Sequence, residues 1–186
     1  MPPSMLREKL ETYASRVAGQ ASTIDLFRAL LDVPACYLRS NLERHFTGSA
    51  WLVSADGQRV LLTHHRKLDR WLQLGGHADG DADLSRVALR EAEEESGLAG
   101  LVVETEIFDL DRHWIPERAD VPGHWHYDVR FVVRATGSEQ FVVSAESHDL
   151  AWRDICAVAG DAAMDESLRR MALRWLERQR QRQRRE

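Results

Sequence analysis

Three glutamates on one predicted helix are the residues of this sequence best suited to chemistry. An apolar repeat predicts a helix over residues 84–98. At 100° per residue, Glu91 and Glu95 fall inside the arc that should be buried, and Glu94 falls at its edge. Because like charges four residues apart repel and buried unpaired charges are unfavourable, we expect a cation beside them. Carboxylate oxygens favour a hard divalent ion such as Mg²⁺ over zinc. A charge-rich helix with a solvated acidic end would show the same spacing.

A glycine-rich segment precedes this helix. Gly75, Gly76 and Gly80 lie close to its N-terminus. Glycines let the backbone approach a ligand closely, and helix N-termini favour anions. A glycine turn followed at a fixed distance by Arg-Glu-Ala-Glu-Glu-Glu-Ser-Gly-Leu is a stronger signal than either feature alone.

Residues 76–98 resemble the Nudix box, the signature of hydrolases that act on nucleoside diphosphates linked to another group. The family pattern is G-x5-E-x7-R-E-U-x-E-E-x-G-U, where U is aliphatic. Ala82 stands where the family has its first glutamate, and Leu74 stands where a proline commonly precedes the paired glycines. The flanking strand pattern extends the resemblance over about residues 45–160. The residues that match the pattern are Gly76, Arg90, Glu91, Ala92, Glu94, Glu95, Gly97 and Leu98.

The resemblance implies a metal cofactor and a reaction. Glu91, Glu94 and Glu95, together with the carbonyl of Gly76, would bind one or more Mg²⁺ or Mn²⁺ ions, and Arg90 would orient the glutamates. Such ions bridge a diphosphate and activate the attacking water. The predicted function is therefore metal-dependent hydrolysis of a diphosphate linkage in a nucleoside diphosphate-X substrate.

The general base has two candidates. Glu91 lies inside the box, whereas Glu146 resembles a glutamate that some members contribute from outside it. An ordinary surface carboxylate explains Glu146 equally well. The departure at Ala82 removes an outer support of the site, for which Asp81 is a candidate substitute.

A second polar pattern runs along a predicted strand over residues 125–134. Polar residues recur with period two from His124 onwards, so they share one face of the strand. Three interpretations stay open: a half-solvated strand, the wall of a substrate pocket, or a second, nitrogen-rich metal site, because His-x-His is a reasonable zinc fragment. The substrate-binding residues that we predict are His77, His124, His126, Asp128 and Arg130. A similar stripe that would face the same pocket consists of Asp109, Asp111 and His113.

Helices and strands must position these residues. Residues 4–31 predict two helices, the second with Ser22 and Asp25 as a capping box. Asp56-Gly57 predicts the turn of a hairpin whose strands cover residues 50–54 and 59–64. Further strands are predicted over residues 101–112, 125–134 and 147–153. Further helices are predicted over residues 165–180 and over residues 84–96, the latter with Asp83 as N-cap and Gly97 as C-terminal stop.

This order of elements predicts the fold class and the domains. We predict an α/β fold, a Nudix-type α/β/α sandwich with a mixed sheet, preceded by an N-terminal helical extension. Residues 1–44 would form that extension, packed on the domain or in a homodimer interface. Residues 45–186 would form the Nudix hydrolase domain, which ends in a C-terminal helix and an Arg-rich tail.

Composition narrows the classes of partner. With 186 residues, 44% of them hydrophobic, the chain can bury a sizeable core. It has no apolar run near the ~20 residues of a membrane span, no apolar leader and only two cysteines, so we expect the cytoplasm and no membrane.

The distribution of charge separates the tail from the rest of the chain. The net charge is −5, but residues 169–186 carry eight arginines against two glutamates, which leaves −11 on the rest. Such a body repels a phosphate backbone, so we expect no nucleic-acid partner. The resemblance to the Nudix box implies a nucleotide-like small molecule as the partner. Two alternatives stay open: a Nudix domain that senses a nucleotide metabolite without cleaving it, and a nucleic-acid-associated protein that binds through the tail.

Overall fold

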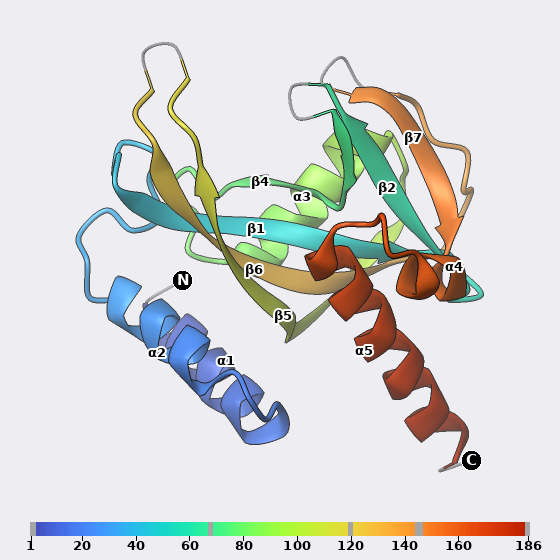
Figure 1. The fold of residues 1–186 in the computed structure, drawn as a ribbon, viewed down its shortest axis with the longest axis horizontal. Helices are drawn as coiled ribbons and strands as arrows, with labels where there is room; N and C mark the ends of the chain where they lie inside the picture. Colours follow the sequence, from blue (N-terminus) through green and yellow to red (C-terminus); the bar gives the residue numbers. More distant parts are fainter. Residues whose placement is uncertain (1–2, 67–68, 119–120, 144–146, 185–186) are drawn as a thin grey trace. The chain divides into compact units, whose positions relative to one another are not determined.

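The computed structural model describes residues 3–66, 69–118, 121–143 and 147–184. Figure 1 shows the helices and strands of these residues. The helices are α1 (Pro3–Arg16), α2 (Ala21–Leu30), α3 (Leu84–Ser96), α4 (Ile155–Gly160) and α5 (Glu166–Gln183). The strands are β1 (Arg44–Val53), β2 (Arg59–His65), β3 (Arg70–Leu72), β4 (Leu74–His77), β5 (Leu101–Ile115), β6 (His124–Ala135) and β7 (Ser147–Asp154).

The strands form a mixed sheet with flanking helices. Its hydrogen-bonded order is β3-β2-β1-β6-β5, while β4 pairs with β1 and β7 pairs with β2. The predicted hairpin joins β1 to β2, with Val53 opposite Val60. Its turn contains Gly57 at a φ of +71°, a conformation that favours glycine. The predicted α/β class, with a helical region before the sheet, is confirmed.

The chain packs as two compact units. The first comprises the described parts of Met1–Ala50, Gly75–Glu91 and Val103–Val132. The second comprises the described parts of Trp51–Leu74, Ala92–Val102 and Val133–Glu186.

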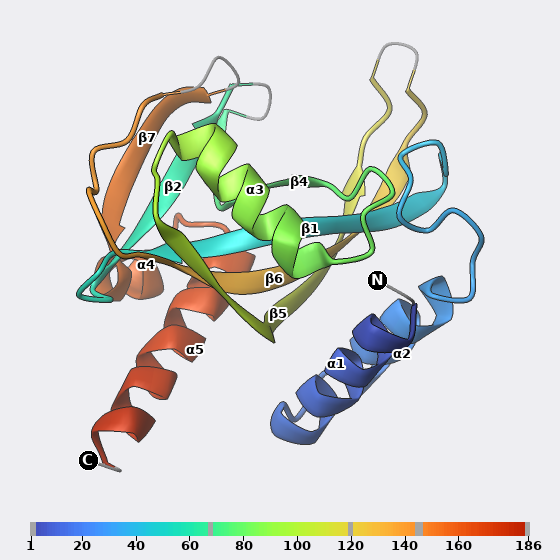
Figure 2. The same ribbon diagram turned by 180° about the vertical axis from the view of Figure 1, so that it is seen from behind.

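Two N-terminal helices form one edge of the first unit's core. Helices α1 and α2 lie side by side in both ribbon views (Figures 1 and 2). The ring of Phe27 on α2 lies 6.1 Å from that of Phe46 on β1 and 5.1 Å from that of Tyr127 on β6, measured between centroids. The N-cap of α2 is Gln20, without a side-chain capping bond, so the predicted capping box is wrong.

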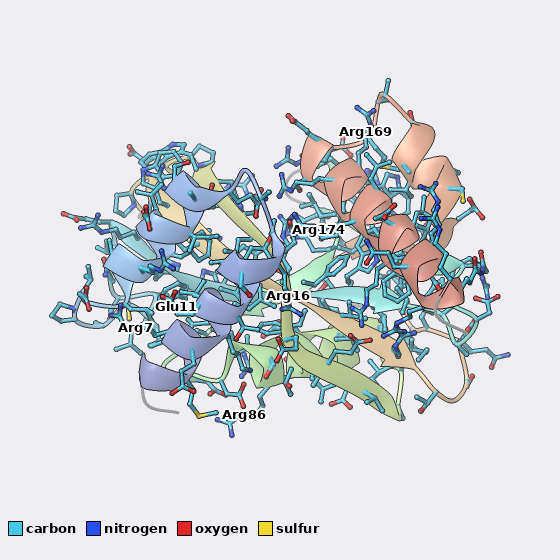
Figure 3. The ribbon with its side chains drawn as sticks, turned by 90° about the horizontal axis from the view of Figure 1, so that it is seen from below. Arg7, Glu11, Arg16, Arg86, Arg169 and Arg174 are labelled. Atoms are coloured by element: carbon cyan, nitrogen blue, oxygen red, sulfur yellow. The ribbon has the colours of Figure 1, made fainter. Side chains whose placement is uncertain are left out.

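The outer surface of these helices is charged. Figure 3 shows Arg7, Glu11 and Arg16 along α1. Glu11 accepts from Arg28 of α2 at 2.7 Å, and Arg16 lies 3.0 Å from Glu106 of β5. Exposed ion pairs of this kind contribute little to stability, so the apolar contacts hold the two helices in place.

The second unit is built on β2, whose other neighbours are β3 and β7. All three strands run antiparallel to their partners. Helices α4 and α5 pack together, and Trp175 of α5 donates its indole N–H to the carbonyl of Gly57 at 2.9 Å. In the described part of the chain, no helix combines the length and the apolarity needed to cross a membrane.

Candidate active site and a cluster of histidines

Helix α3 has a capping residue at its N-terminus and a glycine directly after its C-terminus. Asp83 precedes it, and a carboxylate oxygen of Asp83 accepts from the Ser85 hydroxyl at 2.6 Å and the Arg86 backbone N–H at 3.4 Å. Gly97 follows the helix at a φ of +67° and donates its N–H to the Glu93 carbonyl at 2.8 Å. The predicted N-cap and C-terminal stop are therefore both confirmed.

The Glu91 carboxylate lies directly over the glycine strand β4. A Cβ placed on Gly76 would come within 2.5 Å of a Glu91 carboxylate oxygen, so a side chain at this position would displace the carboxylate. The Arg90 guanidinium donates to Glu91 Oε1 at 2.8 Å and to the His77 carbonyl at 3.2 Å. Only 17% of the Glu91 side chain is exposed. Arg90 thus fixes Glu91 against the backbone of β4, as an orienting residue would.

The other box glutamates follow Glu91 along α3. Glu95 is half-buried and Glu94 is exposed, as the helical wheel predicted, while Glu93 is exposed on the opposite side. Helical spacing keeps Glu91, Glu94 and Glu95 within one turn of each other. Asp81, the candidate substitute for the glutamate missing at position 82, accepts both donors of Arg86 at 2.7 Å.

Arg130 and three aspartates form a buried ionic network in the first unit. Arg130, of which 2% of the side chain is exposed, donates its Nε to Asp128 at 2.8 Å. Its two terminal nitrogens lie 3.4 Å from Asp109 and 3.2 Å from Asp111, both on β5. Burial alone would lower the pKa of Arg130, but the surrounding carboxylates outweigh it and raise that pKa.

The other oxygen of Asp128 is also occupied. It accepts from the hydroxyls of Thr47 at 2.9 Å and Ser49 at 2.7 Å, both on β1. Both predicted substrate-binding residues on this part of β6 are therefore buried, which rules out the half-solvated strand here.

Four histidines gather at the other end of the same strand. His124 and His126 of β6 meet His45 of β1 and His77 of β4, and one ring nitrogen or more of each lies within 4.8 Å of the others. Nε2 of His124 lies 3.1 Å from Nε2 of His126. The ring of His45 lies between the others, with centroids at 4.9 to 5.2 Å.

Burial shifts the acid–base behaviour of this cluster. Desolvation, followed by the nearby Arg39 and His45, lowers the pKa of His77 to about 4. Desolvation and the neighbouring imidazoles lower the pKa of His126 to about 2. The pKa of His45 is lowered too, chiefly by burial. These three rings are therefore neutral at physiological pH, when their nitrogens can act as ligands.

The sequence prediction missed His45. The predicted hairpin strand began near residue 50, whereas β1 begins at Arg44. The signal was present, because His45, Thr47 and Ser49 alternate with apolar or small residues just as the residues of β6 do. Pairing β1 with β6 joins the two stripes into one polar layer.

The structure describes all but one of the predicted site residues. Glu146, the alternative general base, lies outside the described residues. His77, His124 and His126 are brought together, and Asp128 and Arg130 are brought together beside Thr47 and Ser49.

Comparison with known proteins identifies the family. The family model for the NUDIX domain matches residues 44–176, so the chain belongs to the Nudix family. Members of this family are in general hydrolases that cleave nucleoside diphosphate-linked substrates and use divalent metals such as Mg²⁺ or Mn²⁺. A comparison with curated protein sequences finds no match.

Solved structures support the fold. A NUDIX-family hydrolase from Clostridium perfringens has a TM-score of 0.54 at 22% identity, over 73% of this chain and 97% of the other. The MutT protein from Methanosarcina mazei Go1 has a TM-score of 0.56 at 17% identity, over 72% and 94%. An Ap4A hydrolase from C. elegans has a TM-score of 0.54 at 14% identity, over 71% and 95%.

Proposed function

We propose that this protein is a Mg²⁺- or Mn²⁺-dependent pyrophosphohydrolase that cleaves the diphosphate linkage of a nucleoside diphosphate-X substrate. The observation that carries the proposal is the Glu91 carboxylate, which Arg90 holds over Gly76 and which Glu94 and Glu95 follow along the same helix. Family membership supplies the reaction class, and the geometry supports the assignment of roles.

The donor set fits a hard divalent ion. Glu91, Glu94 and Glu95 offer carboxylate oxygens from one face and edge of α3, and Gly76 offers a carbonyl beside Glu91. Oxygen donors of this kind are the ligands that Mg²⁺ and Mn²⁺ prefer. When bound, the ion would neutralise the diphosphate and lower the pKa of the attacking water. Arg90 would keep Glu91 in its binding orientation.

Proton removal from the attacking water is assigned to Glu91 or Glu146. Glu91 is already held at the metal-binding end of the proposed site, which favours it.

The predicted substrate contacts divide into two groups. Asp128 and Arg130 are buried and engage each other, so we assign them a positioning role behind the site. His77, His124 and His126 remain proposed contacts for substrate, with a competing role argued below. The cytoplasmic location, the absence of a nucleic-acid partner, the homodimer and the domain boundary at residue 44 stay predictions.

The test is a hydrolysis screen with Mg²⁺ or Mn²⁺. The substrates should include nucleoside triphosphates, nucleotide sugars, dinucleoside polyphosphates and coenzyme-type diphosphates. We expect Glu91→Gln, Glu94→Gln and Glu95→Gln to lower turnover by orders of magnitude. The matched control is Glu93→Gln, because Glu93 is exposed on the opposite side of the same helix.

The controls separate hydrolysis from binding alone. Wild-type turnover in all three box variants would remove the glutamates from the site. Tight nucleotide binding without product from any substrate would instead favour a sensor, which the Ala82 departure from the box would then explain.

A further inference from the structure

We propose that His45, His77, His124 and His126 form a zinc site that is separate from the carboxylates of α3. All four residues belong to the first compact unit, and they come from three strands, β1, β4 and β6. The inference rests on their own geometry and hydrogen bonds and does not depend on the proposed hydrolase activity.

The spacing of the nitrogens suits one metal ion. A tetrahedral ion with Zn–N bonds of 2.0–2.1 Å holds its ligand nitrogens about 3.3 Å apart. Nε2 of His124 and Nε2 of His126 are already 3.1 Å apart, and all four ligand atoms lie within 4.8 Å of each other. Small side-chain rotations therefore convert the cluster into a four-coordinate site without moving the strands.

Two backbone carbonyls fix the tautomers that a metal needs. Nδ1 of His45 lies 3.0 Å from the Asn41 carbonyl, and Nδ1 of His124 lies 2.9 Å from the Pro122 carbonyl. A carbonyl oxygen can only accept, so each Nδ1 must carry the hydrogen. Each Nε2 then presents a lone pair to the cluster. Metal-binding histidines show this same arrangement, in which the outer nitrogen donates to a carbonyl or carboxylate.

One of these lone pairs has no partner. His45 is 2% exposed, and among the residues that the structure describes its Nε2 has no hydrogen-bond partner. An unsatisfied buried acceptor of this kind destabilises the folded chain. His126 can donate one N–H to His124, but that bond leaves His45 unsatisfied. A bound cation would satisfy the lone pairs of all four rings together.

The donor set selects the metal. Four imidazoles with no carboxylate suit zinc and the neighbouring borderline metals, whereas Mg²⁺ requires oxygen donors. Four protein ligands also fill the tetrahedral shell, so the site is a structural one that has no position for a substrate. Its consequence is to clamp β1, β4 and β6 together, and β4 carries Gly76 next to His77.

The experiment measures zinc content and zinc-dependent stability on the full chain without an affinity tag. After dialysis against a chelator, the protein is titrated with ZnCl₂ and analysed by elemental analysis and thermal unfolding. We expect one zinc ion per chain and a saturable rise in melting temperature. Co²⁺ in place of zinc should give the visible absorption of a tetrahedral site.

The variants test which residues bind zinc. His45→Gln and His126→Leu should weaken zinc binding on the order of 100-fold or more. Glu91→Gln should keep the zinc, because the box carboxylates are not in this ligand set, and His113→Gln is the matched control histidine. The chelator-induced loss of wild-type stability gives a second readout that does not require the variants to fold.

Two results would overturn the proposal. If the wild-type protein bound no zinc, gave no Co²⁺ spectrum and showed no thermal shift, the four histidines would serve only as packed side chains and not as metal ligands. Zinc lost in Glu91→Gln but retained in His45→Gln would place it on the α3 carboxylates. Because neither readout uses substrate, a failure here is distinguishable from a failure of the hydrolase assignment.

Discussion

Strand β6 carries two polar pairs that are buried in different ways. Asp128 and Arg130 lie in a network in which Thr47, Ser49, Asp109 and Asp111 supply partners. Two residues earlier, His124 and His126 face other imidazoles, and the adjacent His45 has a nitrogen without a partner. The charged groups of the Asp128–Arg130 half of the polar layer find their partners within the protein. The histidine half instead offers nitrogen lone pairs to a ligand.

This difference separates structural polar groups from ligand-binding ones. Burying a charge is tolerated only where opposite charges and hydrogen bonds surround it, as they surround Arg130. Burying several neutral acceptors that face each other gains nothing unless a donor or a cation joins them. The two halves should therefore respond differently to the same kinds of change.

The largest expected effect is the loss of Arg130. Arg130→Met removes the cation that the buried Asp109 and Asp128 share with the half-buried Asp111, and breaking such a network lowers the free energy of unfolding by about 3–5 kcal/mol. Asp128→Asn is the comparison variant, because it removes one of the excess negative charges and should lower the free energy of unfolding less. Urea denaturation of both proteins measures the difference. A change below about 1 kcal/mol in Arg130→Met would mean that the network contributes nothing to stability.

A fall in pH should lower the stability of the folded chain first through the histidine half of the polar layer. The pKa of His77 is about 4 and that of His126 about 2, both below the 6.5 of an exposed histidine. Below pH 6.5 these two histidines therefore bind protons in the unfolded chain but remain unprotonated in the folded chain. The metal-free protein should lose up to about 1.4 kcal/mol per pH unit for each of these two groups as the pH falls from 6.5 to 4, with full stability above that window. The charged or titratable groups around these two rings are Arg39, His45, Asp79, His113 and His124.

Urea denaturation in EDTA at several pH values tests this window. The matched comparison is His126→Leu, which removes one of the two groups and should lose stability less steeply as the pH falls. Equal slopes in the two proteins would show that His126 is not protonated differently in the folded and unfolded chains.

We expect the substitution His126→Leu to have a smaller effect on the free energy of unfolding at pH 7.5 in the presence of a chelator. The substitution removes a neutral ring and leaves no charge unpaired. It leaves His124 Nε2 without its partner at 3.1 Å, which should lower the free energy of unfolding by about 1–2 kcal/mol. Thermal and urea unfolding measure the loss. A loss as large as that of Arg130→Met would remove the contrast between the two halves of β6.

Local signals in the sequence predicted much of the fold. The capping residue Asp83 and the stop at Gly97 fixed α3 because both act on backbone groups within one turn. The Asp56-Gly57 turn fixed the β1–β2 hairpin for the same reason. Strands β3 and β4 and helix α4 were missed, since segments of three to six residues contain too little of a repeat to detect.

Long-range pairing explains what the sequence could not predict about the site. Period two correctly placed His124, His126, Asp128 and Arg130 on one face, but it does not show which strands lie beside that face. The partners Thr47, Ser49 and Asp109 come from β1 and β5, 20 or more residues away, and they make Arg130 structural. The positions of the box glutamates on α3 were predictable because helical spacing needs no distant partner, whereas their metal-binding role stays a prediction.

The smallest expected effect concerns His113, the residue that touches both halves. Its ring lies 5.5 Å from that of His126, and its Nδ1 lies 3.0 Å from a carboxylate oxygen of Asp111 in the network of Arg130. Because 36% of its side chain is exposed, water can replace either contact, and His113→Gln should change the free energy of unfolding by less than about 1 kcal/mol. Zinc content should stay at the wild-type level, because the ring nitrogens of His113 are not among those within 4.8 Å of each other. Elemental analysis and urea denaturation of the same sample measure both quantities. Loss of zinc with unchanged stability would replace one of the four proposed ligands by His113, whereas loss of stability with zinc retained would assign His113 to the ionic half of the layer.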